Sequence, residues 1–185
     1  GSYTAELFKQ LEGKFSSISS KIAFEVKPFV SNAKNGSSPD QVVEHWKNVS
    51  QIRNKTNDLQ HDLNQVDNSI KVMLKAYDKA KSNEPALQEK LLELRKDLLA
   101  LQQRIGGSKA RSEVGEKNEF PTIRDYIWPA SSYGTTYGPT KLQLKCLDNA
   151  NQLYNELTAQ LTKIKDAIEP LQTELQKIGA PKIRD

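Results

Sequence analysis

Residues 141–178, KLQLKCLDNANQLYNELTAQLTKIKDAIEPLQTELQKI, decide the fold of this chain. Apolar side chains recur in this stretch at alternating steps of three and four residues. The series runs through Leu147, Ala150, Tyr154, Leu157, Leu161, Ile164, Ile168, Leu171, Leu175 and Ile178. This spacing places the series on one stripe of a helix, and such a stripe is buried against other helices. We therefore predict a long C-terminal helix that packs into a helical core.

Two earlier segments repeat the same spacing. The first contains Thr56, Leu59, Leu63, Val66, Ile70, Met73 and Tyr77, and the second contains Leu87, Leu91, Leu94, Leu98, Leu101 and Ile105. Three amphipathic stripes joined by short connections favour helices that alternate in direction around one core. The chain is therefore predicted to be mainly α, an up-down-up three-helix bundle.

Local signals give the ends of these helices. Ser38 and Thr140 each precede a glutamine by three residues, which is the capping-box pattern. Pro85 suits the first turn of the middle helix, and Gly107 suits its end. We predict helices over residues 39–82, 85–106 and 141–178, so that two helices are long and one is short.

The short helix can cover only half of its two partners, so another segment must cover the rest. Segment 107–138 lies at that part of the path and is rich in large apolar side chains, namely Phe120, Ile123, Tyr126, Ile127, Trp128, Tyr133 and Tyr137. We predict an ordered aromatic cover with a short helical turn over residues 122–127. It packs over Trp46, Val49 and Ile52, and Trp128 is buried near Trp46.

Residues 1–31 follow a different pattern. Apolar and polar residues alternate around Tyr3, Ala5 and Leu7 and again around Ile22, Phe24 and Val26, with a turn signal at Glu12-Gly13. Such alternation predicts a β-hairpin, the remnant of a preceding β-sandwich, followed by a helical bundle domain over residues 32–185. A helix through residues 7–22 is the alternative, but Gly13 and four serines disfavour it.

The composition excludes several kinds of function. The net charge is +4, from 27 basic and 23 acidic residues that are interleaved along the helices, so we expect no nucleic-acid surface. No run of about eighteen apolar residues is present, so no membrane insertion is expected. The single cysteine, Cys146, excludes an internal disulfide and a thiolate zinc site and is expected to be packed.

The chain offers no constellation for catalysis or metal binding. His45 and His61 are sixteen residues apart, so we expect them on the surface or flank of their helix rather than on a metal. Carboxylate pairs such as Glu89 and Glu93 fall on a predicted exposed helix face, where general acid chemistry finds no support. We expect no catalytic residue, no cofactor and no metal.

The aromatic residues of segment 120–137 form the one candidate interaction surface. It comprises Phe120, Tyr126, Trp128, Tyr133 and Tyr137. Exposed and coplanar rings could stack on sugars, as in a carbohydrate-binding module. Packing over the two long helices is the favoured interpretation, because those helices have an apolar half to cover.

The order of these signals resembles a known family. Residues 3–14, YTAELFKQLEGK, and residues 24–29, FEVKPF, resemble the last strands of the small β-sandwich in large bacterial sortilin-like β-propeller proteins. These are BNR-repeat, sialidase-type proteins usually labelled glycosyl hydrolases. In them the sandwich precedes a helical segment with a Pro-x-Ile-x-Asp stretch, a Pro-Thr helix start and a Gly-Ala-Pro close. The corresponding residues here are 121–125, 139–140 and 179–181.

The resemblance implies a non-catalytic C-terminal accessory or scaffolding domain of a secreted or periplasmic protein. It implies packing on the β-propeller of the same chain or on another protein, and a homodimer through the N-terminal hairpin is possible. The Gly-Ser start, without an initiator methionine, suggests an excised piece of that larger protein. Two alternatives remain open: a spectrin-like or coiled-coil interaction module, and a carbohydrate-binding module that uses the aromatic residues of 120–137.

Overall fold

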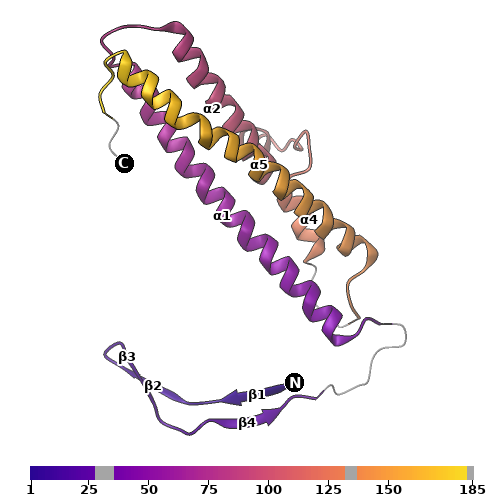
Figure 1. Ribbon diagram of the computed structural model, residues 1–185. Helices are drawn as coiled ribbons and strands as arrows, with labels where there is room; N and C mark the ends of the chain where they lie inside the picture. The colour runs from indigo at the N-terminus through magenta and orange to yellow at the C-terminus, as the bar shows by residue number, and fades with distance from the viewer. Residues whose placement is uncertain (28–35, 132–136, 183–185) are drawn as a thin grey trace. The chain divides into compact units, whose positions relative to one another are not determined.

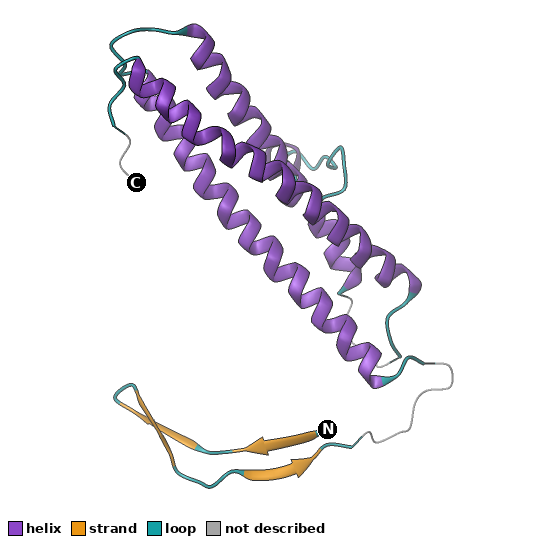
Figure 2. Cartoon of the chain, in the orientation of Figure 1, coloured by secondary structure: helices purple, strands orange, loops and turns teal. Residues whose placement is uncertain are grey.

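The computed structural model of the chain describes residues 1–27, 36–131 and 137–182. It is mainly helical with a small N-terminal β region, which confirms the predicted class (Figures 1 and 2). The chain divides into two compact units, residues 1–36 and 37–185. Residues 32–35, at the start of the predicted bundle domain, lie outside the described residues, as does Tyr133.

The N-terminal unit is a bent hairpin of four short strands. β1 (Ser2–Ala5) pairs antiparallel with β4 (Ile22–Glu25), and β2 (Phe8–Leu11) pairs antiparallel with β3 (Lys14–Ser17). Glu12 and Gly13 turn the chain with φ values of 50° and 78°. Two successive positive φ values are typical of the tight turn that matches the twist of a hairpin. The hairpin prediction is confirmed, and the helical alternative is wrong.

The helical unit contains α1 (Pro39–Tyr77), α2 (Pro85–Gly106), α3 (Lys109–Glu113), α4 (Ile123–Ala130) and α5 (Lys141–Lys177). The capping boxes predicted at Ser38 and Thr140 are both present, with reciprocal bonds to Gln41 and Gln143. A third capping box, between Thr122 and Asp125, begins α4. The starts of α1, α4 and α5 are therefore fixed by side chains three residues downstream, whereas α2 begins at Pro85 without a side-chain cap.

The end of α1 differs from the prediction, because the helix stops at Tyr77 and not near Ser82. The backbone N–H groups of Lys81 and Ser82 donate to the carbonyl of Ile178, at 3.2 and 3.3 Å. The Tyr77 hydroxyl donates to the Asn83 side chain. Residues 81 and 82 therefore lie outside α1, where their N–H groups bond to the carbonyl of Ile178 at the C-terminal cap of α5.

α1, α2 and α5 each contact the other two helices. Two cross-helix ion pairs give their alignment, since Lys165 of α5 meets Asp62 of α1 at 2.7 Å and Lys90 of α2 meets Glu174 of α5 at 2.9 Å. The predicted stripes form the core. Its fully buried large residues include Ile52, Leu63, Ile70, Met73, Leu87, Leu91, Leu98, Ile105, Leu157 and Leu175. Cys146 is buried, as predicted.

α4 covers the N-terminal part of this core mainly with the predicted aliphatic residues Ile123 and Ile127. Of the predicted aromatic residues of α4, Tyr126 packs partly against the core and Trp128 does not. Ile123 and Ala130 are 0% exposed and Ile127 is 7% exposed, and they share a cluster with Val49 and Ile52. Steps of four and three residues put these side chains on one helix face. Trp128 falls on the opposite side and is 81% exposed. The prediction of a buried Trp128 is wrong.

The capping box of α5 supports a stability prediction. Thr140→Ala removes the hydroxyl that accepts from the Gln143 backbone N–H at 3.2 Å, so we expect a loss of about 1 kcal/mol in unfolding free energy. Thr162→Ala, in the exposed middle of the same helix, is the control and should change stability by less than about 0.5 kcal/mol. Urea unfolding followed by circular dichroism measures both, and equal losses would contradict the capping role.

No helix in the described part of the chain is long and apolar enough to cross a membrane.

Candidate functional site

The structure does not bring the five predicted aromatic residues together. Phe120 is 58% exposed, lies under the Arg104 guanidinium at 5.5 Å and lines a groove between α2 and α5. Trp128 lines a separate groove between α1 and α4. Tyr126 is half-buried against the core, and Tyr137 is 51% exposed. A sugar-stacking platform needs neighbouring coplanar rings, and these residues supply none within the described segments.

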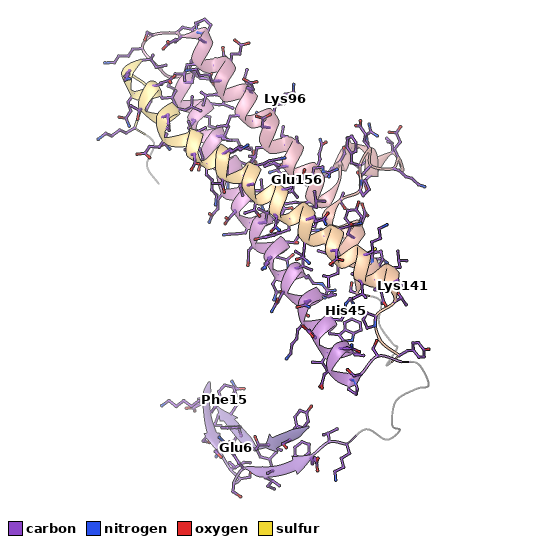
Figure 3. The ribbon with its side chains drawn as sticks, turned by 45° about the vertical axis from the view of Figure 1, so that its right-hand side comes forward. Glu6, Phe15, His45, Lys96, Lys141 and Glu156 are labelled. Atoms are coloured by element: carbon purple, nitrogen blue, oxygen red, sulfur yellow. The ribbon has the colours of Figure 1, made fainter. Side chains whose placement is uncertain are left out.

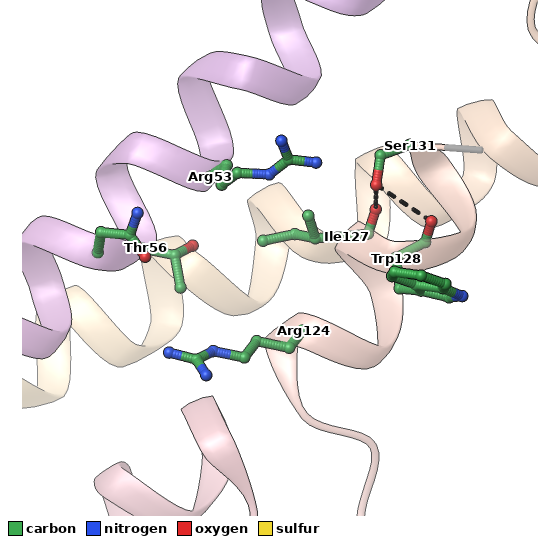
Figure 4. A pocket seen from close by; sticks show the side chains of 7 residues that line it. Arg53, Thr56, Arg124, Ile127, Trp128 and Ser131 are labelled. Carbon is green, nitrogen blue, oxygen red and sulfur yellow. Dashed lines mark hydrogen bonds between the residues drawn. The ribbon is translucent and has the colours of Figure 1, made fainter. Parts of the chain in front are cut away.

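A second groove of the helical unit lies between α1 and α4. It has a volume of about 420 Å³. Its walls comprise Arg53, Thr56 and Asn57 from α1, and Arg124, Ile127, Trp128 and Ser131 from α4 and its C-terminal cap (Figure 4). We call this cavity the α1–α4 groove. Among the described residues that line it, only Trp128 was singled out from the sequence as a candidate site residue.

Side-chain hydrogen bonds cap both ends of α4, the helix that carries the exposed indole of Trp128. At its start, the Asp125 carboxylate accepts from the Thr122 backbone N–H at 2.8 Å. At its end, the Ser131 hydroxyl donates to the Ile127 carbonyl at 2.6 Å and lies 3.1 Å from the Trp128 carbonyl. Both ends of this short helix are thus fixed by side chains, and the indole projects from a rigid backbone.

His45 of α1 contacts the C-terminal end of α4. The prediction that it lies on the surface or flank of its helix is wrong. His45 is 5% exposed, and its Nε2 lies 2.9 Å from the Ala130 carbonyl. Figure 3 labels His45 near the N-terminal end of α1. His45 stands four residues before Val49, so the stripe of α1 extends one turn further than we recognised. The carbonyl at the end of α4, which only the tertiary structure brings near, makes a polar residue fit this core position.

The charge in the α1–α4 groove has one sign. Figure 4 shows the side chains of Arg53 on α1 and Arg124 on α4 at opposite sides of the groove, and no carboxylate is among the described residues that line it. The hydroxyl of Thr56 donates to the Ile52 carbonyl at 2.7 Å, as that of Ser131 does to Ile127. Both hydroxyl hydrogens are therefore used internally, and the groove offers apolar surface with cationic groups.

Metal binding finds no support in the ranges that the structure describes, where no three His, Cys, Asp or Glu side chains are placed to hold an ion. His61 bonds to Gln65 at 3.0 Å on the exposed side of α1. Glu89 and Glu93 are exposed, as predicted.

The hairpin presents a second candidate surface. Its exposed large apolar residues are Tyr3, Leu7, Phe8, Leu11, Phe15, Ile18, Ile22, Phe24 and Val26. In the outer pair of strands, Tyr3 stacks on its partner Phe24 with ring centroids 5.8 Å apart. We call the side of this pair that carries Tyr3, Ala5, Ile22 and Phe24 the hairpin face.

Comparison of this chain with protein-family models, curated proteins and solved structures finds no match.

Proposed function

We propose that this chain is a non-catalytic accessory domain of a secreted or periplasmic sortilin-like β-propeller protein. In this proposal the hairpin completes a β-sandwich of the same protein. The helical unit is a three-helix bundle with parallel long helices, which packs on the propeller or on a partner protein as a scaffold.

The hairpin face carries this proposal. Tyr3, Ala5, Ile22 and Phe24 lie on one side of the β1–β4 pair, while Ser2, Thr4, Glu25 and the small Ala23 lie on the other. A sheet with one apolar and one polar side is typical of a sandwich in which a second sheet covers the apolar side. An isolated two-stranded hairpin is at best marginally stable in water. Residues 3–14 and 24–29 resemble the last strands of such a sandwich, and this resemblance also supports a second sheet as the structure that covers the hairpin face.

The two alternative functions have less support. The exposed aromatic residues Phe120 and Trp128 line separate grooves, which disfavours a sugar-binding strip. A spectrin-like module has three helices of comparable length, whereas α2 has 22 residues beside the 39 of α1 and the 37 of α5.

A deletion tests whether the hairpin belongs to another structure. Removal of residues 1–36 should leave the unfolding free energy of the helical unit unchanged within about 0.5 kcal/mol, because no buried core residue comes from the hairpin. Denaturant unfolding of the two chains measures this. A loss of several kcal/mol would mean that the hairpin serves the helices and not a separate sandwich.

Amide hydrogen exchange tests the occupant of the hairpin face. In the 185-residue chain the amides of β1 and β4 should exchange fast, and they should become protected when the preceding domain of the full-length protein is present. Phe24→Lys, on the apolar side, should abolish this protection, whereas Thr4→Lys, on the polar side, should preserve it. Protection in the short chain that rises with protein concentration would instead indicate pairing between two copies.

A further inference from the structure

We propose that the free edge of β1 binds a further β-strand, which joins the hairpin as a third strand and carries apolar side chains at alternate positions. The order in the resulting sheet is added strand, β1, β4. In the proposed function this strand belongs to the preceding sandwich, so its source rests on that proposal, whereas the choice of edge does not. The edge of the hairpin is a surface distinct from the hairpin face.

The backbone hydrogen bonds between β1 and β4 determine which groups lie at the edges. The amino group of Gly1 donates to the Val26 carbonyl at 2.6 Å, and the Val26 N–H donates to the Gly1 carbonyl at 2.9 Å. Residues that exchange two bonds in this way alternate, along an antiparallel pair, with residues that exchange none. Since Tyr3 pairs with Phe24 two positions further on, these two residues form the next bonded pair.

Four residues therefore turn their backbone groups away from the partner strand. The intervening pairs, Ser2 with Glu25 and Thr4 with Ala23, are non-bonded. The outward N–H and C=O groups of Ser2 and Thr4 form what we call the β1 edge, and those of Ala23 and Glu25 form the β4 edge. All four residues are exposed. Such a row of backbone groups is a template that another strand binds through main-chain hydrogen bonds.

Charge distinguishes the two edges. The β4 edge includes Glu25, whose carboxylate pairs with the Lys27 ammonium at 3.3 Å, whereas β1 has the uncharged sequence SYTA. Charged side chains, lysine above all, are the usual means by which natural proteins prevent further pairing at an edge strand. Near the bend, Glu6 and Lys21 form an ion pair at 3.9 Å that lies at the end of both edges alike. The β1 edge is therefore the open one.

The hairpin face determines the side chains of the added strand. Side chains alternate between the two sides of a sheet along each strand. β1 places Tyr3 and Ala5 on one side and Ser2 and Thr4 on the other. An added strand that alternates apolar and polar residues extends the apolar side, where Tyr3 is 54% and Phe24 is 47% exposed. A third strand also stabilises the sheet, because a two-stranded hairpin is at best marginally stable in water.

A tethered strand tests the choice of edge in the 185-residue chain. The strand Lys-Val-Thr-Val-Thr-Val-Lys is joined to Gly1 by a flexible Gly-Ser linker of about 12 residues, which can reach either edge. The matched control replaces the three valines of the tether by proline, which disfavours a strand. In amide hydrogen exchange followed by NMR, Ser2 and Thr4 should exchange roughly ten-fold more slowly than in the control, and Ala23 and Glu25 should change by less than about two-fold.

Two proline substitutions are the matched variants. Thr4 and Ala23 lie opposite each other, and each turns its N–H outward, so proline at either position removes an edge donor but no hydrogen bond within the hairpin. In the tethered chain Thr4→Pro should abolish the protection of Ser2, whereas Ala23→Pro should retain it. Nuclear Overhauser contacts between Tyr3 and Phe24, whose ring centroids lie 5.8 Å apart, check that each variant keeps its hairpin. The exchange pattern of the unsubstituted chain decides the edge even if a variant does not fold.

Protection of Ala23 and Glu25 in place of Ser2 and Thr4 would overturn the choice of edge, and protection of neither pair would overturn strand addition. Protection that appears without the tethered strand and rises with chain concentration would assign the β1 edge to a second copy and reject the partner that we propose. Because the tethered chain contains no preceding domain, these failures are distinguishable from failure of the sandwich proposal, which the exchange experiment with that domain decides.

Discussion

Replacement of Leu161 by alanine should lower the free energy of unfolding by about 2–5 kcal/mol, the usual cost of truncating a large aliphatic side chain in a packed core. Leu161 is 3% exposed and belongs to the main core cluster, with Leu157 and Ile164 of the same helix. The loss combines the transfer free energy of the removed groups with that of the cavity left behind. Urea unfolding followed by far-UV circular dichroism measures it.

Leu142→Ala is the matched control for this experiment. Leu142 lies on α5 as well but is 64% exposed, so the same chemical change should cost less than about 0.5 kcal/mol. Because both substitutions replace Leu by Ala in one helix, differences in helix propensity nearly cancel. A loss below about 1 kcal/mol for Leu161→Ala would mean that the stripe of α5 is not buried.

Ile123→Ala should produce a second large effect, again about 2–5 kcal/mol. Ile123 is 0% exposed and packs in the cluster that contains Val49 and Ile52, so its truncation opens a cavity beneath α4. We also expect faster hydrogen exchange of the α4 amides, because α4 has only eight residues and depends on this contact. Denaturant unfolding and exchange measured by NMR test the two parts.

Trp128→Ala in the same helix is the decisive comparison. Its ring is 81% exposed, so its removal should change stability by less than about 0.5 kcal/mol, although it is the larger side chain. If Trp128→Ala cost several kcal/mol while Ile123→Ala cost little, the aromatic residues would be the cover after all. The pair therefore shows which face of α4 stabilises the core.

The helical stripes and the helix starts could be predicted because both depend on short sequence separations. Residues three and four apart share a helix face in any context, and a capping residue bonds to a backbone N–H three residues away. The two long helices, the shorter α2 and the starts of α1 and α5 were therefore predicted correctly, although the end of α1 was not. The hairpin was predictable for the same reason, since its turn at Glu12-Gly13 joins adjacent strands.

The α1–α4 groove was not predictable to the same degree. Segment 107–138 contains both aliphatic and aromatic residues. The prediction placed Trp128 in the core because it assumed that the large aromatic side chains are the buried ones. Eight residues of α4 give one buried face, and steps of four and three through Ile123, Ile127 and Ala130 already marked that face. Arg53 and Arg124 carry no local signal, because their place on the walls of one groove depends on how α4 lies across α1.

The sequence by itself determined the helix-rich class, the helix starts and the hairpin, because periodicity and capping act within a few residues. Only the tertiary structure decided where α1 ends, since the carbonyl of Ile178 that draws in Ser82 is 96 residues away along the chain. It also decided that His45 is buried, because its partner is the carbonyl of Ala130. The position of Trp128 follows from the same cause: α4 can turn only one face to the core, and packing against α1 and α5 selects the aliphatic one.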